Sequence, residues 1–160
     1  MVTVPLKRLV IFSAFFCVSL VTHAQVLDRK TLSLEAANKI IAGAIAEAKA
    51  NNWLVDVAVV DEAGHLLSFQ RMDGALIGSI EVAIGKARTA SLFRRPTKVL
   101  EEAAKTRPAI VTLPHGVLLQ GGVPVVVNGQ TVGAVGVSGV TSQQDEQIAE
   151  AGVRHAGLSQ

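Results

Sequence analysis

The sequence predicts an α+β fold in which helices pack on a mainly antiparallel sheet. Two hairpin patterns support this class. Two apolar runs are joined by the short segment "EAG", and two valine-rich runs are joined by Asn128-Gly129, a typical hairpin turn. Helical periodicity precedes the first hairpin, separates it from the second and follows the second. We therefore expect a single layered domain.

The first helix is expected over residues 33–51, with Ser33 as its N-cap. Its apolar residues recur at helical spacing, namely Ile40, Ile41, Ala44, Ile45 and Ala48. The first hairpin follows, with strands over 55–61 and 65–72. Strict alternation in the second strand places one set of side chains on one face: His65, Leu67, Phe69 and Arg71. The other face then carries Leu66, Ser68, Gln70 and Met72.

A second helix is expected over residues 76–93, with Asp73 as its N-cap beside a turn glycine. Small residues form one stripe of this helix, namely Gly78, Val82, Gly85 and Thr89. A glycine inside a helix costs about 1 kcal/mol relative to alanine. We therefore expect another backbone, a partner subunit or a flat ligand to approach Gly85 closely.

The C-terminal half completes the alternation of elements. A short third helix is expected in "RRPTKVLEEAAKT", with Thr97 as its cap. The second hairpin occupies "VPVVVNGQTVGAVGVSG", where the strand glycines would let a helix lie close to the sheet. A last helix is expected to open at Ser142, with Asp145 completing a capping box, and to end near Gly157.

The N-terminus has the layout of a secretory signal peptide over residues 1–24. Lys7 and Arg8 precede the uncharged run "LVIFSAFFCVSLV", and Ala24 offers a cleavage site. A membrane anchor is the alternative, but the run is short for a span of about 20 residues. Phe15 and Phe16 before Cys17 argue against a lipoprotein. We expect a periplasmic or secreted domain over residues 25–160, with no membrane association after cleavage.

Composition narrows the classes of function. The chain has 15 Lys and Arg against 13 Asp and Glu, and two of the basic residues lie in the expected signal peptide. The exported domain is then close to neutral, which gives no reason to expect a nucleic-acid partner. Its single cysteine, Cys17, would leave with the signal peptide. Disulfides, thiolate metal sites and a cysteine nucleophile are thereby excluded.

Several side chains are expected to edge a groove with apolar walls and cationic rims. Arg71 and Met72 end an apolar strand in "SFQRMDGA", and Lys86 lies beside the small-residue stripe. His115 lies in an apolar loop between Pro114 and a glycine. A salt bridge from Arg71 to a neighbouring carboxylate is an equally good explanation of that arginine.

The chain resembles the GlcG/HbpS family, the haem-binding or haem-degrading domain family that is related to the C-terminal domain of a corrinoid adenosyltransferase. The resemblance is carried by "VAVVDEAGHLLSFQRMDGA", "KARTASLF", "GGVPVVVNGQTVGAVGVSG" and "QDEQIAEAG", in that order. It covers residues 32–157. It implies a profilin-like single domain with a mainly antiparallel, five-stranded sheet flanked by helices. It also implies a homo-oligomer.

The resemblance further implies haem as a cofactor. With no Cys or Tyr in the exported domain, the iron would take His65, His115 or Met72, and the Thr89 hydroxyl is a weaker alternative. Arg71 and Lys86 would meet the propionates, Thr89 and its neighbouring glycine would leave room for the ring, and Asp73 would belong to the hinge beneath it. The motif alone does not choose between the histidines.

Three functions follow from these observations. The leading one is an exported haem-binding protein involved in iron or redox sensing. The second is an enzyme or binding protein for a small hydroxy acid, diol or aromatic acid, in which Arg71 would bind a carboxylate and His115 or Asp73 would move a proton. The third is a structural or signalling subunit whose small-residue helix packs only on its own copies. The sequence leaves enzymatic activity open.

Overall fold

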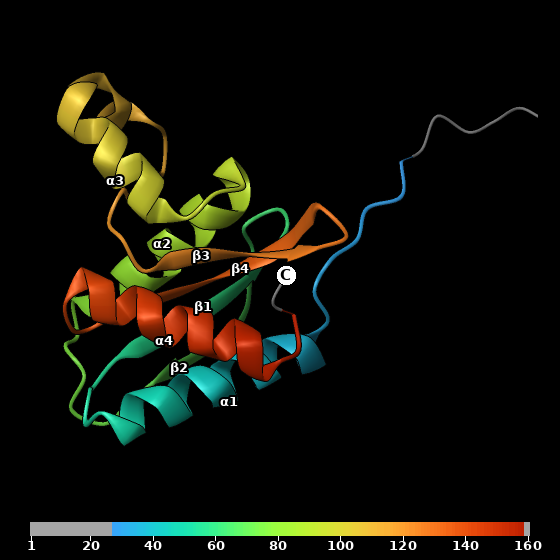
Figure 1. The fold of residues 1–160 in the computed structure, drawn as a ribbon, viewed down its shortest axis with the longest axis vertical. Coiled ribbons are helices and arrows are strands. Elements are labelled where there is room, and N and C mark those ends of the chain that lie inside the picture. Colours follow the sequence, from blue (N-terminus) through green and yellow to red (C-terminus); the bar gives the residue numbers. More distant parts are fainter. Residues whose placement is uncertain (1–26, 159–160) are drawn as a thin grey trace, which may run out of the picture.

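The computed structural model describes residues 27–158 and confirms an α+β domain (Figure 1). The expected signal peptide over residues 1–24 lies outside the described residues. The helices are α1 (Leu34–Ala50), α2 (Ser79–Phe93), α3 (Thr97–Thr106), the 3-10 helix η1 (Pro108–Thr112) and α4 (Ser142–His155). The strands are β1 (Asp56–Asp61), β2 (Leu66–Arg71), β3 (Gly122–Val127) and β4 (Gln130–Ser138).

The four strands form one sheet in the order β2-β1-β4-β3, with every neighbouring pair antiparallel. The expected count of five strands is therefore wrong for the described residues. Both hairpins contribute two strands each, and β1 joins them by pairing with β4. The segment between α3 and β3 contains Pro108 and Pro114 and forms η1 and a loop.

The sequence predicted the turn of the second hairpin correctly, but it did not predict the bulge in the first. Asn128 and Gly129 both have positive φ, 52° and 74°, as a two-residue turn of type I′ requires. The first hairpin has a register shift opposite β2, between Val59 and Val60. As a result, Leu67 packs on the α1 and α4 side of the sheet, whereas Phe69 packs on the α2 side. The expectation that they share a face is wrong because a bulge interrupts strict alternation.

Helices cover both faces of the sheet. The α1 and α4 pair lies on one face, α2 lies on the other, and α3 projects beyond the sheet (Figure 1). The α1 and α4 face contains the large aliphatic core, including Ile40, Ile148, Val57 and Val135. The α2 face is built from small buried residues, namely Ala58, Ala83, Ala87, Ala90 and Ala134. Small side chains let the α2 backbone approach the strands closely.

Gly136 of β4 shows how close that approach is. A Cβ atom at this position would overlap the Ala83 carbonyl oxygen and the Ala87 nitrogen of α2. Because both of these are backbone atoms, the helix would have to move to admit a methyl group. The expectation that strand glycines let a helix lie on the sheet is confirmed.

The helix caps agree with the sequence in part. Ser33 caps α1 by accepting a hydrogen bond from the Ala36 N–H, as expected. The capping box of α4 lies one residue earlier than expected, because Thr141 is the N-cap and Gln144 completes the box. Asp145 is consequently available for a different contact. None of the helices within residues 27–158 is long and apolar enough to cross a membrane.

Thr97 has a tertiary role in place of the expected capping role. The N-cap of α3 is Pro96, and Thr97 is the first helical residue. The Thr97 hydroxyl accepts a hydrogen bond from the Gly122 N–H at 2.9 Å and also lies 3.4 Å from the Gly122 carbonyl oxygen. Thr97 is fully buried, so its hydroxyl fixes the start of α3 to the first residue of β3.

Candidate functional site

The space beside the small-residue stripe of α2 is filled by the chain itself. The Val117 N–H donates to the Thr89 hydroxyl at 2.8 Å, and this hydroxyl donates to the Gly85 carbonyl oxygen at 2.8 Å. A Cβ atom on Gly85 would overlap a methyl group of Val117. The close approach expected at Gly85 is therefore made by a side chain of the loop after η1. Gly85 and Thr89 do not line an open slot.

Lys86 points into the protein and not toward a rim. Its Nζ lies 2.7 Å from Oδ2 of Asp145 and 2.9 Å from the carbonyl oxygen of Val137. Both side chains of the ion pair are only 3% exposed. Burial raises the pKa of Asp145, and the Lys86 ammonium and the Val140 N–H oppose that rise. Lys86 thus ties α2 to β4 and α4, and its ammonium is already engaged.

The segment after β2 is a turn on the surface. Asp73 is exposed and precedes Gly74, which has a φ of 86°. Because α2 starts only at Ser79 with Gly78 as its N-cap, the expectation that Asp73 caps this helix is wrong. Met72 is half-buried against the aliphatic core on the α1 and α4 side. Its sulfur therefore belongs mainly to the packing.

Arg71 is exposed and makes no salt bridge to the residues that the structure describes. Its neighbour across the strands is Asp56, which is fully buried. Neither carboxylate oxygen of Asp56 has a hydrogen-bond partner within the described part of the chain. Burial raises the pKa of Asp56 above its ordinary value of 3.8, and the positive charge of Arg71 partly opposes the rise.

The buried Asp56 predicts a dependence of stability on pH. Because its pKa is raised in the folded state, Asp56 contributes stability that is fully present below pH 3.8 and is lost as the pH rises through the folded-state pKa. Asp56→Asn removes this titration. Urea unfolding over a pH series should show the variant gaining stability relative to wild type as the pH rises, until the folded-state pKa is passed. Parallel stability curves for the two proteins would contradict this assignment.

The two candidate histidines lie on turns that contact α2. His65 follows Gly64, whose carbonyl oxygen accepts a hydrogen bond from Arg88 of α2 at 3.3 Å. The His65 Nδ1 is 3.5 Å from a carboxylate oxygen of Asp61, and the side chain is 81% exposed. His115 lies two residues before Val117, which packs on Gly85 of α2. Both imidazoles therefore lie in turns that are anchored on α2.

His115 differs from His65 in its backbone and its contacts. Its φ of 58° lies in the left-handed region, which a non-glycine residue adopts at an energetic cost. The side chain is exposed and makes no hydrogen bond or salt bridge to the rest of the described chain. The surrounding loop is apolar, with Leu113, Val117 and Leu118 half-buried. The loop thus presents an unpaired imidazole beside apolar surface.

Further apolar side chains are exposed on β2, on α2 and on the turn that precedes α2. Leu66, Leu76, Ile77 and Leu92 are exposed, with Ile77 at 77%. Phe69 of β2 and Ile80 and Ile84 of α2 are half-buried. We refer to these seven residues as the α2 apolar face. Within the described residues, no group of three or more His, Cys, Asp or Glu side chains could hold a metal ion by itself. An iron ion bound at this face would therefore need most of its ligands from a cofactor and not from the described side chains.

The sequence analysis did not predict that Asp56 and Asp145 are buried, although the sequence contains a signal for each. Asp56 stands in the otherwise apolar strand "VDVAVV", on the same face as Ala58 and Val60. Asp145 lies on the apolar stripe of α4 with Ile148 and Ala149, at positions i, i+3 and i+4. A charged residue at a core position predicts a buried partner or a functional role.

Comparisons with known proteins identify a matching family, a similar protein and similar solved structures. Residues 32–154 match the protein family described as "Haem degrading protein HbpS-like". Protein GlcG of Escherichia coli strain K12 is 51% identical over 108 residues, which cover 67% of this chain and 81% of GlcG. The crystal structure of HbpS superposes with a TM-score of 0.80 at 36% identity, covering 85% of this chain and 96% of HbpS.

A further solved structure is described as the PduOC:Heme complex. It has a TM-score of 0.75 at 26% identity and covers 81% of this chain and 97% of PduOC. Both TM-scores show that this chain shares its overall fold with HbpS and PduOC.

Proposed function

Because this chain belongs to the GlcG/HbpS family, we propose that it is a haem-binding protein. The observation that carries the proposal is the exposed imidazole of His115, which is held in a left-handed backbone conformation on an apolar loop that packs on α2 through Val117. Haem needs an apolar surface for its ring and a nitrogen, sulfur or oxygen ligand for its iron. The haem complex of PduOC, a relative with the same fold, supports the same function.

His115 is the better of the candidate iron ligands. The His65 imidazole already lies near the Asp61 carboxylate, and Met72 is packed against the core. The Thr89 hydroxyl is fully buried and makes two hydrogen bonds. His115 alone among these groups is both exposed and unpaired within the described chain. It would hold the iron through a ring nitrogen, and the bound haem would supply the redox chemistry of its iron.

The α2 apolar face would contact the macrocycle. Ile77 and Leu92 offer exposed aliphatic surface, and burial of apolar area contributes about 25 cal/mol per Å². Arg71 at the end of β2 is exposed and could bind a propionate, since no carboxylate within 4 Å among the described residues neutralises it. Lys86 is buried in its own ion pair, so the cation for the second propionate would come from elsewhere.

A second copy of the chain would complete the site. One protomer can cover only one side of a flat ligand on an exposed face, and contiguous apolar surface on a protein is a mark of association. We therefore propose a homo-oligomer in which the α2 apolar face is buried. The signal-peptide layout of residues 1–24 supports export to the periplasm or beyond, where the protein would sense iron or redox state.

Hemin titration tests the proposed function. Purified protein should shift and sharpen the Soret band of hemin and should saturate at a defined ratio of hemin to protomer. Protoporphyrin IX without iron should bind more weakly, because it lacks the bond to His115. A spectrum identical to that of hemin mixed with an inert protein of similar size would exclude haem binding.

A further inference from the structure

A groove of about 600 Å³ runs along the open edge of β3, and none of the residues of the α2 apolar face line it. Val123 and Val126 of β3 form its floor. Val153 and Leu158, at the C-terminal end of the chain, form one wall. Leu158 and the two floor valines are only half-buried, so aliphatic surface is open to the groove. An apolar body would fit this floor.

Arg94 lies at one rim of this groove in an unusual backbone position. It follows the last residue of α2 with φ 53° and ψ 41°, the left-handed conformation in which helices commonly place glycine. A side chain there costs stability. The Arg94 side chain is exposed and its guanidinium makes no hydrogen bond or salt bridge to the residues that the structure describes. The chain thus keeps an unpaired cation where glycine would be more stable.

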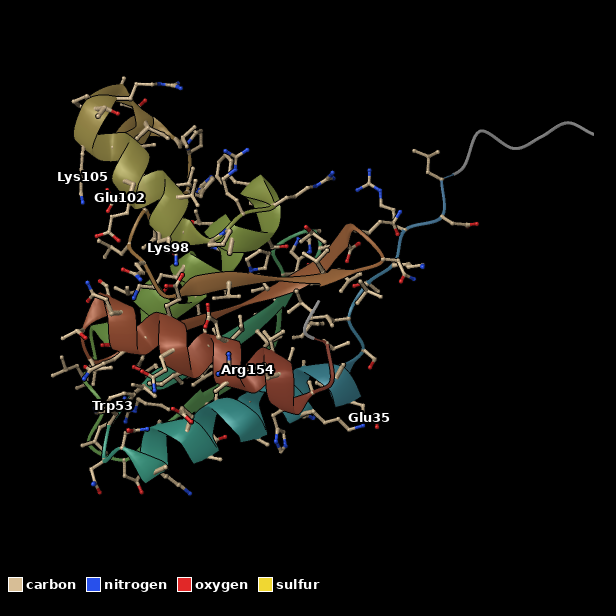
Figure 2. The ribbon with its side chains drawn as sticks, in the orientation of Figure 1. Glu35, Trp53, Lys98, Glu102, Lys105 and Arg154 are labelled. Atoms are coloured by element: carbon tan, nitrogen blue, oxygen red, sulfur yellow. The ribbon has the colours of Figure 1, made fainter. Side chains whose placement is uncertain are left out.

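Arg154 lies on α4 (Figure 2). It supplies a second cation to the same groove. Its nearest carboxylate is that of Glu150, one helical turn earlier, at 3.5 Å. Both side chains are about half exposed, and such surface pairs are weak. The groove therefore has two guanidinium groups against one carboxylate. This excess of positive charge is complementary to an anionic ligand.

The edge of β3 is closed to an added peptide strand. The Gly122 N–H is bonded to the buried Thr97 hydroxyl. Pro124 in the middle of the strand has no N–H to donate. A peptide cannot form a regular ladder along this edge. This edge therefore does not favour a peptide strand as the occupant.

We propose that this groove binds an apolar organic acid, with the carboxylate held by Arg94 and Arg154 and the hydrocarbon body on Val123, Val126 and Val153. Guanidinium groups bind carboxylates through two parallel hydrogen bonds, which fixes the orientation of the ligand. The residues that line this groove include neither His115 nor any residue of the α2 apolar face. It requires neither haem nor His115.

Two fluorescent probes with related aromatic bodies test this proposal. 8-Anilinonaphthalene-1-sulfonate has an anionic group, and N-phenyl-1-naphthylamine lacks it. Arg94→Gln should weaken binding of the sulfonate about tenfold, since a charge-assisted hydrogen bond is lost. Binding of the neutral amine should be unchanged. Arg107→Gln, at an exposed arginine beyond α3, is the matched control and should leave both affinities unchanged.

Arg94→Gly separates binding from folding. This variant should weaken the sulfonate to the same extent while raising the thermal midpoint, because glycine favours the left-handed conformation. In competition, 2-naphthoate should displace the sulfonate probe from wild type and 2-naphthol should not. Equal sulfonate affinity in wild type and Arg94→Gln, a parallel loss of the neutral probe, or equal displacement by the acid and the alcohol would each overturn the proposal.

Discussion

Replacing Lys86 with alanine is expected to lower the free energy of unfolding by about 3–5 kcal/mol. The substitution leaves the Asp145 carboxylate buried without its cation, and it also removes the hydrogen bond to the Val137 carbonyl oxygen. Contacts among α2, β4 and α4 meet at this ion pair. Urea unfolding followed by circular dichroism measures the loss. A decrease below about 1 kcal/mol, the scale of a surface pair, would contradict the assigned role.

An exposed ion pair of the same chain provides the control. Lys105 and Glu102 on α3 are 2.6 Å apart, but their side chains are 64% and 67% exposed (Figure 2). Lys105→Ala should therefore leave the free energy of unfolding nearly unchanged. The two substitutions remove the same side-chain atoms, and the two ion pairs have similar N–O distances, 2.7 and 2.6 Å. The difference between their effects isolates the contribution of burial.

A double variant and a pH series identify the origin of the loss. Lys86→Met combined with Asp145→Leu should recover most of the stability, because an apolar pair of similar volume leaves no buried charge. Lys86→Ala alone should lose less stability at acidic pH, where Asp145 takes up a proton and becomes neutral. If the double variant is as unstable as Lys86→Ala, the loss of stability comes from altered packing and not from the unpaired charge of Asp145.

Local signals in the sequence were sufficient for most of the fold. Asn128-Gly129 specifies its turn through the backbone angles of two adjacent residues, and Ser33 caps α1 through the third residue beyond it. The capping box of α4 was misplaced by one residue because Thr141 and Ser142 are both good N-cap residues. Errors of this kind come from neighbouring positions with equal propensity.

Long-range contacts explain why much of the candidate site could not be predicted. Lys86 and Asp145 are 59 positions apart, and Val117 meets α2 from a loop that has no regular structure of its own. Helical spacing placed Gly85 on a small-residue stripe, but it could not say which group approaches there. The bulge at Leu67 likewise depends on pairing with β1. His115 was selected by its apolar loop, and the structure adds its exposure and its left-handed backbone.

Replacing His115 with asparagine is expected to weaken hemin binding at least about tenfold, because the iron loses its protein ligand. Asparagine adopts the left-handed conformation readily, so the φ of 58° and the loop should be retained. Exogenous imidazole should bind the vacated iron position and restore the wild-type Soret spectrum. His65→Ala, which removes the other exposed candidate, is the matched control and should leave the affinity for hemin close to that of wild type.

The ligand of the bound iron tests the central claim most directly. Electron paramagnetic resonance of the hemin complex should report an iron–imidazole bond in wild type and in His65→Ala, and loss of that bond in His115→Asn. An unchanged signal in His115→Asn, or loss of the signal in His65→Ala instead, would contradict a haem site formed by His115 and the α2 apolar face.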